Sequence, residues 1–545
     1  MTQDDDWWRG AVIYQIYPRS FFDSNGDGIG DLPGVTAKLE HVAGLGVDAI
    51  WLCPFFCSPQ ADFGYDVADH VAVDPQFGTL ADFDRLVAHA HALGLRVLID
   101  QVWSHTSDRH AWFLDSRNSR EAARADWYVW ADPEEDGTAP NNWLSVFGGP
   151  AWTWEPRRRQ YYLHHFLTRQ PALNLHNPAV VDAVLEAGAF WLRRGVDGFR
   201  LDAIDFMLHD RRLRSNPPAP PAAEGVPAKL FGMQLHLHDM MQPETLGVMA
   251  QIRRLLDLHP GAVALGEVSS QEGALARVRR LTVGTGHLHM AYTLRPLRGG
   301  FDHATLSALL ADIAAEEDGW PCWSFSNHDV ERAVSRWHPR GRAAGHDPAF
   351  ARLLMALLLS LRGSVCIYQG EELGLTEAEL PLAALRDPFG IAHFPAFRGR
   401  DGSRTPIPWD GDAAQAGFTT GTPWLPIPAA HRALAADRSA LAEDWRRFLH
   451  WRRACPALVR GRLLPLDLPA PLIGFVRSWQ GTRVLALFNP AEREASADLG
   501  GLARLRPLPQ SGFAPRIAGD TAMLPPFGVL FAELETAMQP ALLPA

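Results

Sequence analysis

Cysteine is scarce in this chain of 545 residues, which contains only five, at positions 53, 57, 322, 366 and 455. They are too few and too scattered to form the disulfide framework of a secreted protein. Cys53 and Cys57 have no histidine or second cysteine pair nearby that would complete a zinc site. We therefore expect reduced thiols and a cytoplasmic protein.

Long hydrophobic runs are missing as well. The longest apolar stretch lies within 353–361 and is about half as long as a membrane-spanning helix. Positions 4–6 are acidic, where a signal peptide would be basic and then apolar. Acidic residues outnumber basic ones by 62 to 51, which argues against binding to nucleic acid. We expect no membrane or nucleic-acid partner, and a monomer or weak dimer.

The sequence does contain a repeated pattern: a short apolar run, a loop and then an amphipathic helix, through residues 10–370. Apolar strands that alternate with helices are typical of a parallel sheet covered on both faces. An open doubly wound sheet would need a glycine-rich phosphate turn after its first strand, which this sequence lacks. The pattern therefore predicts an α/β fold, a (β/α)8 TIM barrel. Its expected strands are 11–16, 47–52, 95–99, 196–201, 262–265, 287–292, 322–325 and 365–367.

Two regions break this pattern and indicate additional domains. Residues 104–177 are irregular and lie between the third strand and the next helix, which predicts a subdomain inserted after strand 3. After about 455 the apolar residues alternate and are separated by turns such as Gln480-Gly481, which predicts a C-terminal β-sandwich. The expected domains are the barrel (1–103 and 178–454), the inserted subdomain (104–177) and the sandwich (455–545).

Acidic residues follow four of the expected strands: Asp100, Asp202, Glu267 and Asp329. One such carboxylate often only caps the next helix, but in a barrel the carboxyl ends of all strands meet at one mouth. Gathered carboxylates raise the pKa of one member, and we expect the nearby Arg200 to keep Asp202 ionised. One acid and one ionised carboxylate are the pair that glycoside hydrolysis requires.

Four strand-end segments, in this order along the chain, carry a resemblance to a known family. They are Asp100-Gln-Val-Trp-Ser-His105, Gly198-Phe-Arg-Leu-Asp202, Gly266-Glu-Val268 and Phe325-Ser-Asn-His-Asp329, and Tyr14-Gln-Ile-Tyr-Pro-Arg-Ser20 precedes them. With these segments the chain resembles the α-amylase family, glycoside hydrolase family 13, and within it the α-glucosidase and oligo-1,6-glucosidase branch. The likeness runs over nearly the whole chain.

The resemblance implies a role for individual residues. Asp202 is similar to the family's nucleophile, Glu267 to its general acid/base, and Asp329 to the carboxylate that holds two sugar hydroxyls. The substrate-binding residues that it implies are Asp62, Tyr65, His105, Phe147, Phe166, Gln170, Arg200, Ala203, His328 and Arg400. Ser104 and Ala172 depart from the usual asparagine and aspartate, which leaves the subfamily open but retains every catalytic carboxylate.

A loop near the N-terminus spaces oxygen donors at alternate positions: Asp23, Asn25, Asp27, Ile29 (through its carbonyl) and Asp31. This spacing resembles the first nine positions of an EF-hand loop, although Gly34 stands at the twelfth, where a glutamate would complete it. The same family branch carries this loop as a cation site. We therefore expect a structural Ca²⁺ or Mg²⁺ and no organic cofactor, with a plain turn as the alternative.

The resemblance implies a retaining α-glucosidase that acts on short α-glucosides and transfers glucose to sugar or alcohol acceptors. A sugar isomerase (maltose to trehalose) or a sucrose-using glucosyltransferase would share the catalytic residues and remains the alternative. A non-catalytic member of the same fold would have lost its carboxylates, which this chain retains. Ala203, where α-1,6-cleaving relatives carry valine, indicates a preference for α-1,4 disaccharides such as maltose.

A long proline-rich connection, 211–227, follows the nucleophile strand and contains prolines at 217, 218, 220, 221 and 227. Loops at this end of a barrel build the active-site mouth, and proline restricts their freedom. We expect a fixed wall that excludes longer glucans and shields the glucosyl-enzyme from water. A solvent-exposed linker is the alternative.

Overall fold

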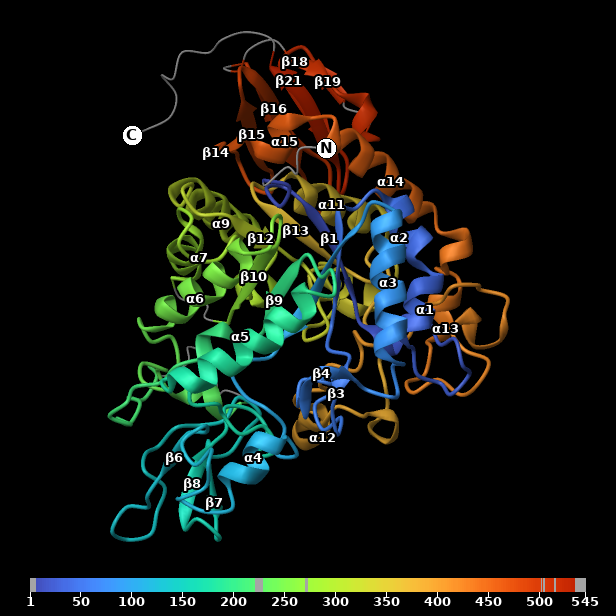
Figure 1. Cartoon of the computed structure of the whole chain (residues 1–545). Helices are drawn as coiled ribbons and strands as arrows, with labels where there is room; N and C mark the ends of the chain where they lie inside the picture. Colours follow the sequence, from blue (N-terminus) through green and yellow to red (C-terminus); the bar gives the residue numbers. More distant parts are fainter. Residues whose placement is uncertain are drawn as a thin grey trace.

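The computed structural model describes residues 6–220, 229–269, 273–500, 502, 505–513 and 516–534. Its centre is a closed barrel of eight parallel strands in the order β1-β13-β12-β11-β10-β9-β5-β2 (Figure 1). The strands are β1 (Val12–Ile16), β2 (Ala49–Leu52), β5 (Arg96–Gln101), β9 (Gly198–Leu201), β10 (Val263–Val268), β11 (Met290–Thr293), β12 (Pro321–Trp323) and β13 (Ser364–Tyr368). Each overlaps an expected strand, so the (β/α)8 barrel prediction is confirmed.

Most residues of the barrel strands are apolar because both faces of the strands are buried, and charged residues such as Asp100, Arg200 and Glu267 lie towards their carboxyl ends. Inside the barrel, large side chains such as Trp51, Met290 and Tyr292 form one packed cluster. The register places Asp100 beside Arg200 and Glu267 beside Tyr292. Pairing between parallel strands thus brings charged side chains from distant segments to one end of the barrel.

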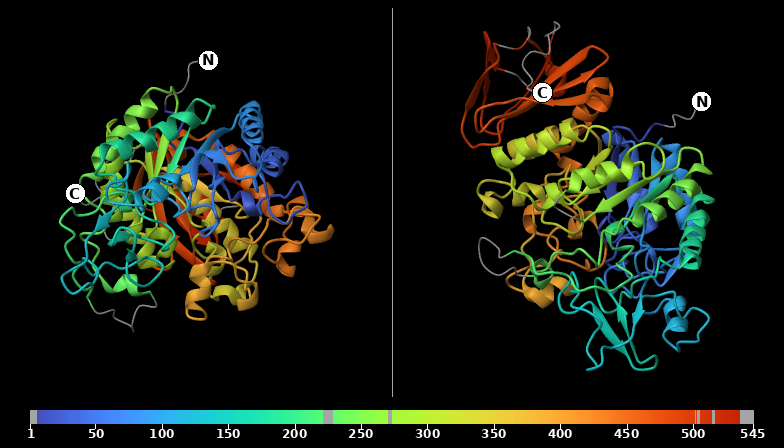
Figure 2. Two further views of the ribbon diagram at one scale, coloured as in Figure 1. Left: turned by 60° about the horizontal axis from the view of Figure 1, so that its bottom comes forward. Right: turned by 90° about the vertical axis from the view of Figure 1, so that its left-hand side faces the viewer.

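Helices surround the barrel, as Figure 2 shows. Local signals set their ends: Thr79 and Asp82 form a capping box at the start of α3 (Leu80–Ala92), and Asn177 caps α5 (Pro178–Leu192). The other helices of the barrel region are α1 (Leu32–Ala37), α2 (Leu39–Leu45), α6 (Thr245–Asp257), α7 (Ala274–Thr282), α8 (Arg295–Arg298), α9 (His303–Ala315), α10 (Ala333–Arg336), α11 (Pro348–Ser360), α12 (Pro388–His393), α13 (Ala429–Arg432) and α14 (Ala440–Arg453).

The segment between β5 and α5 forms a small subdomain at the end of the barrel opposite the C-terminal sheets (Figure 1). It contains α4 (Ala111–Ser116) and a three-stranded sheet of β6 (Trp130–Ala131), β8 (Gln160–Leu163) and β7 (Trp152–Glu155). The short hairpin β3 (Phe56–Cys57) and β4 (Asp69–Val73) and helix α12 lie at the same end. Elements inserted after different strands thus gather around one mouth.

After α15 (Pro456–Arg460) the chain forms two antiparallel sheets, as expected for a β-sandwich. One contains β14 (Arg462–Pro465), β15 (Ile473–Trp479), β16 (Thr482–Phe488), β21 (Val529–Leu534) and β18 (Leu505–Pro507), and the other β17 (Ala495–Asp498), β20 (Thr521–Leu524) and β19 (Arg516–Ala518). Gln480 and Gly481 join β15 to β16 with φ values of 45° and 86°, the left-handed pair that a tight hairpin needs.

All five cysteines are free thiols. Within the described ranges, no helix is both long and apolar enough to cross a bilayer.

Candidate active site

One arginine joins three carboxylates at the carboxyl ends of β5, β9 and β10. Arg200 Nη1 lies 2.8 Å from Asp100 Oδ1 and 2.6 Å from Asp202 Oδ1, and Arg200 Nη2 lies 2.8 Å from Glu267 Oε2. The Tyr292 hydroxyl donates to Glu267 Oε1 at 2.9 Å. The structure therefore brings the first three strand-end carboxylates together around Arg200.

This cluster contains one guanidinium and three buried carboxyl groups, so a single positive charge cannot balance three ionised carboxylates. Burial raises the pKa of Asp202 well above its ordinary value, and Arg200 opposes this rise without overcoming it. Burial likewise raises the pKa of Asp100 to about 6 against the pull of Arg200. Arg200 acts on Asp202 in the expected direction, by lowering its pKa, although burial has the larger effect. The cluster as a whole favours holding a proton, which a site with one acid and one nucleophile needs.

The fourth carboxylate, Asp329, lies against two arginines and the ring of His328. Its Oδ1 lies 2.8 Å from Arg404 Nη2 and 3.3 Å from Arg400 Nη1, and its Oδ2 lies 3.3 Å from His328 Nε2. Burial alone would raise the pKa of Asp329, but these neighbours outweigh it and hold the pKa well below its usual range. Asp329 is therefore an ionised acceptor for hydroxyl groups.

Arg400 connects Asp329 with two further acids. Its Nη2 lies 2.8 Å from both Asp62 Oδ1 and Asp387 Oδ1, and its guanidinium carbon lies 5.0 Å from the centre of the Phe147 ring. Asp62 Oδ2 accepts a hydrogen bond from Gln170 Nε2 at 3.0 Å. Arg400 thus joins the barrel mouth to the inserted subdomain.

Two neutral imidazoles complete the polar part of the site. Burial lowers the pKa of His105 and of His328 to about 3, so both rings are uncharged at neutral pH. His105 Nε2 lies 3.0 Å from the Tyr65 carbonyl and 3.2 Å from Gln170 Nε2, while His328 stacks on the Tyr65 ring at 5.1 Å. Ser104 places its Oγ 2.9 Å from His105 Nδ1.

An apolar cluster borders these polar residues. Phe147 and Phe166 from the inserted subdomain meet edge to face at 5.7 Å, and Phe166 packs beside Ala203. Ala203 has a left-handed backbone, with φ of +44°, and its N–H donates to Glu267 Oε2 at 3.1 Å. The residue after Asp202 therefore orients Glu267 through its backbone.

Sequence reasoning missed three residues of this site: Tyr292, Asp387 and Arg404. A tyrosine at the end of an expected strand is a weak signal, and Asp387-Pro388 reads only as the start of a helix. Their partners lie far away in sequence, so no local pattern could assign them.

The oxygen-rich loop at 23–31 folds as a ladder of turns. The side-chain oxygens of Asp23, Asn25 and Asp27 each accept from the backbone N–H two residues on, at 3.0, 2.8 and 2.8 Å. Asp31 Oδ1 accepts from Gly34 N and so caps α1, while Asp31 Oδ2 lies 3.1 Å from Ser24 N. Across the described residues, no three His, Cys, Asp or Glu side chains gather in a metal-binding group.

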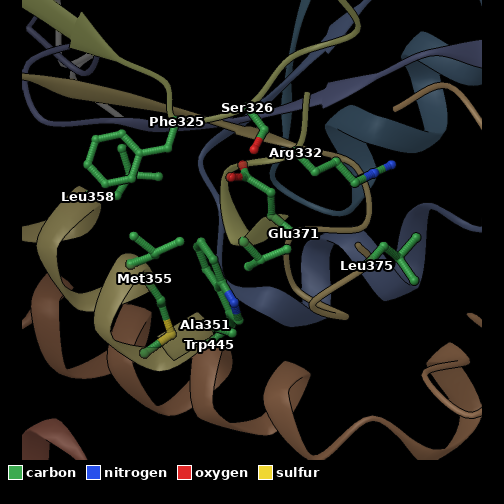
Figure 3. Close-up of a pocket in the computed structure, with 11 residues that line it drawn as sticks. Phe325, Ser326, Arg332, Ala351, Met355, Leu358, Glu371, Leu375 and Trp445 are labelled. Atoms are coloured by element: carbon green, nitrogen blue, oxygen red, sulfur yellow. The ribbon is translucent and has the colours of Figure 1, made fainter. Parts of the chain in front are cut away.

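A small cavity is lined by Phe325, Ser326, Arg332 and residues of α11 (Figure 3). Its volume of about 20 Å³ is close to that of one water molecule and too small for a sugar. Glu371 lines it, and burial raises the pKa of this carboxyl to about 7. Within the described residues Trp445 Nε1 has no partner, so a water suits this cavity.

The fold and this cluster agree with comparisons to known proteins. The model of the α-amylase catalytic domain matches residues 15–461. The chain belongs to the α-amylase family. It is thus a glycoside hydrolase of family 13, as its strand-end segments predicted.

Similar proteins place this family-13 enzyme within the α-glucosidase group. A probable α-glucosidase of Rhizobium meliloti (strain 1021) is 52% identical, with 98% of each chain covered. An oligo-1,6-glucosidase of Heyndrickxia coagulans is 34% identical, over 90% of this chain and 94% of its own. The crystal structure of an α-glucosyl transfer enzyme, XgtA, superposes with a TM-score of 0.93 at 51% identity and covers 97% of this chain and 99% of its own.

Proposed function

We propose that this enzyme is a retaining α-glucosidase that removes the non-reducing terminal glucose of short α-glucosides. The observation that carries the proposal is Arg200 bridging Asp202 and Glu267, at 2.6 and 2.8 Å. Retaining enzymes hold their two carboxyl groups about 5 Å apart, whereas inverting enzymes leave room for a water between them. Two carboxylates that share one guanidinium are compatible with the shorter spacing.

In this reaction Asp202 attacks the anomeric carbon while Glu267 donates a proton to the glycosidic oxygen, so the C–O bond breaks and the leaving sugar departs as an alcohol. Glu267 then removes a proton from water or an acceptor hydroxyl, which attacks the same carbon and releases Asp202. Asp329, Asp62 and Arg400 hold the hydroxyls of the terminal glucose. Replacing Asp202 by asparagine tests this mechanism: full activity on an α-glucoside would refute it.

The proposed linkage preference is for α-1,4 bonds, as in maltose. Ala203 packs against Phe206 and Met240, directly beside the residues that would meet the second sugar. A β-branched side chain is unfavourable at its φ of +44° and would also fill this space. Comparing kcat/KM for maltose and isomaltose tests this proposal, and faster turnover of isomaltose would overturn it.

Transfer to sugar or alcohol acceptors is proposed as a second outcome of the same intermediate. The loop after β9 supports it, because its described part is fixed to the inserted subdomain. Asn142 Nδ2 donates to the Asn216 carbonyl at 2.9 Å, and Trp143 Nε1 donates to the Arg214 carbonyl at 2.8 Å. This favours a standing wall over a solvent linker; Pro221 and Pro227 lie outside the described residues. Shortening 215–226 to a Gly-Ser bridge should raise activity on maltotetraose relative to maltose.

A sugar isomerase or a sucrose-using glucosyltransferase is the second candidate. A trehalulose synthase, MutB, superposes with a TM-score of 0.85 at 31% identity and covers 97% of this chain. Incubation with maltose, isomaltose, sucrose and trehalose, followed by NMR of the products, separates the candidates. Glucose release from maltose with retained anomeric configuration supports the glucosidase, and conversion into another disaccharide without free glucose supports the isomerase.

We also propose a structural Ca²⁺ or Mg²⁺ in the loop at 23–31. The ligands would be the side chains of Asp23, Asn25, Asp27 and Asp31 and the Ile29 carbonyl. Asp23 is buried, and Thr419 Oγ1 donates to its Oδ2, which connects the loop to the segment around 419. The cation would stabilise this part of the fold and take no part in the chemistry.

A further inference from the structure

A series of aromatic contacts lies beside the proposed active site, where Phe147 meets Arg400 and Phe166 packs against the cluster of Ala203. We name it the rim ring and define it as Phe147, Phe166, Phe206, Phe231, Lys229, Phe397 and Phe389. The centroid distances are 5.7 Å for Phe147–Phe166, 5.2 Å for Phe166–Phe206, 6.3 Å for Phe206–Phe231, 4.7 Å for Phe389–Phe397 and 4.7 Å for Phe147–Phe389. Lys229 stands two residues before Phe231 in the chain and contacts Phe389 and Phe397, so the backbone between Lys229 and Phe231 completes the circuit.

Lys229 joins two loops that follow different strands. Its Nζ lies 4.3 Å from the centre of the Phe389 ring in α12 and 4.0 Å from that of Phe397. Both distances are within the range of cation–π attraction. The circuit thus crosses from the loop after β9 to the loop after β13 at a lysine, in a chain that has only two lysines.

The loop after β9 also has contacts on the side that faces the proposed nucleophile. Phe231 stacks on His236 at 3.6 Å, and His236 Nε2 lies 2.8 Å from the Phe231 carbonyl. Phe231 also packs against the cluster of Ala203, Phe206 and Met240, beside the proposed nucleophile. The loop is therefore fixed on its inner side, and Lys229 is its attachment on the α12 side.

We propose that Lys229 is a specificity-determining residue. Its contacts with Phe389 and Phe397 hold the loop after β9 against α12, an attachment that we call the clip. The clip keeps the rim ring closed to α-glucans longer than two sugars. The proposal rests on the proposed function, because it concerns which α-glucosides reach Asp202. Its physical basis is the charge of the ammonium group: a neutral side chain of similar length keeps the apolar contact but loses the attraction to both ring faces.

The test compares Lys229→Met with Lys38→Met. Lys38 is a matched control, since its Nζ lies 4.5 Å from the Phe22 ring centre and 4.8 Å from that of Trp409, outside the rim ring. We expect Lys229→Met to raise the kcat/KM ratio of maltotetraose to maltose about 5- to 30-fold, as expected for the loss of one exposed to one desolvated cation–π contact. Lys38→Met should leave this ratio unchanged, and Lys229→Arg, which retains a cation, should stay close to the wild type.

Amide hydrogen exchange provides a readout that does not depend on activity. Exchange in residues 229–240 should be faster in Lys229→Met than in the wild type or Lys38→Met. Equal exchange in all three proteins, or an unchanged sugar ratio in Lys229→Met, overturns the clip. If the wild type hydrolyses no α-glucoside, the proposed function fails, while the exchange experiment still decides whether Lys229 clips the loop. Lys229→Gln is the second neutral variant if the methionine variant does not fold.

Discussion

Asp387 offers a direct test of how this site holds a terminal glucose. The carboxylate accepts from Arg400 Nη2 at 2.8 Å and from Arg400 Nε at 3.0 Å, and it also caps α12 by accepting from Phe389 N at 3.2 Å. Replacing it by asparagine preserves the cap, because asparagine and aspartate are equally good N-caps. The substitution keeps this cap but removes the negative charge and the acceptor Oδ2, which also accepts from the Arg400 backbone N–H at 2.8 Å.

The expected loss follows from these contacts. A hydrogen bond to a charged group contributes about 1.5–3 kcal/mol, and asparagine can retain only one of the two side-chain bonds to Arg400. We expect Asp387→Asn to lower kcat/KM by about 30- to 150-fold, equivalent to about 2–3 kcal/mol. The loss should occur mainly through KM and be similar for maltose and p-nitrophenyl α-glucoside, since both present the same terminal glucose.

The matched control is Asp302→Asn, which changes the exposed N-cap of α9 in the same way. Asp302→Asn should leave kcat and KM unchanged. The reasoning is refuted if Asp387→Asn keeps the wild-type KM, or if it lowers kcat alone together with the melting temperature, as a purely structural role would.

Three further predictions concern the pH dependence, the general acid and the metal. Burial raises the pKa of Asp202 and raises that of Asp100 to about 6, and the nucleophile must be ionised. Activity should therefore fall as the pH drops through these raised values. A kcat/KM profile that is still flat near pH 4.5 would contradict this. Glu267→Gln should slow maltose by about 100-fold or more but affect p-nitrophenyl α-glucoside far less, because that leaving group needs little protonation; equal losses would exclude Glu267 as the acid. Removal of divalent cations with EDTA should lower the melting temperature of the wild type, and added Ca²⁺ or Mg²⁺ should restore it. Asp27→Ala should abolish this response. A melting temperature that does not change with EDTA would argue for a plain turn.

Much of the fold could be predicted because buried segments appear in the sequence as short apolar runs. Each barrel strand contains a short, mostly apolar run, since a strand covered on both faces has no solvent-exposed side. The Gln480-Gly481 hairpin and the caps of the helices are equally local, because a few neighbouring residues determine them. The expected ends were less accurate: Glu267 lies within β10 and does not follow it.

The candidate site was readable only in part. Asp202, Glu267 and Asp329 could be found because each follows or ends an apolar run, and a barrel brings all such positions to one mouth. The sequence could not show which of these groups holds a proton. That depends on burial and on Arg200, which contacts three carboxylates in the folded structure.

The sequence by itself determined the barrel, its inserted subdomain, the C-terminal sheets and the strand-end carboxylates, because each depends on patterns a few residues long. The tertiary structure alone decided the contacts of Arg400 with Asp62, 338 positions away, and with Asp387, and the closure of the rim ring through Lys229. Such contacts depend on how loops from separate strands pack against one another. A charged or aromatic side chain finds its partner only after the barrel has brought those loops together.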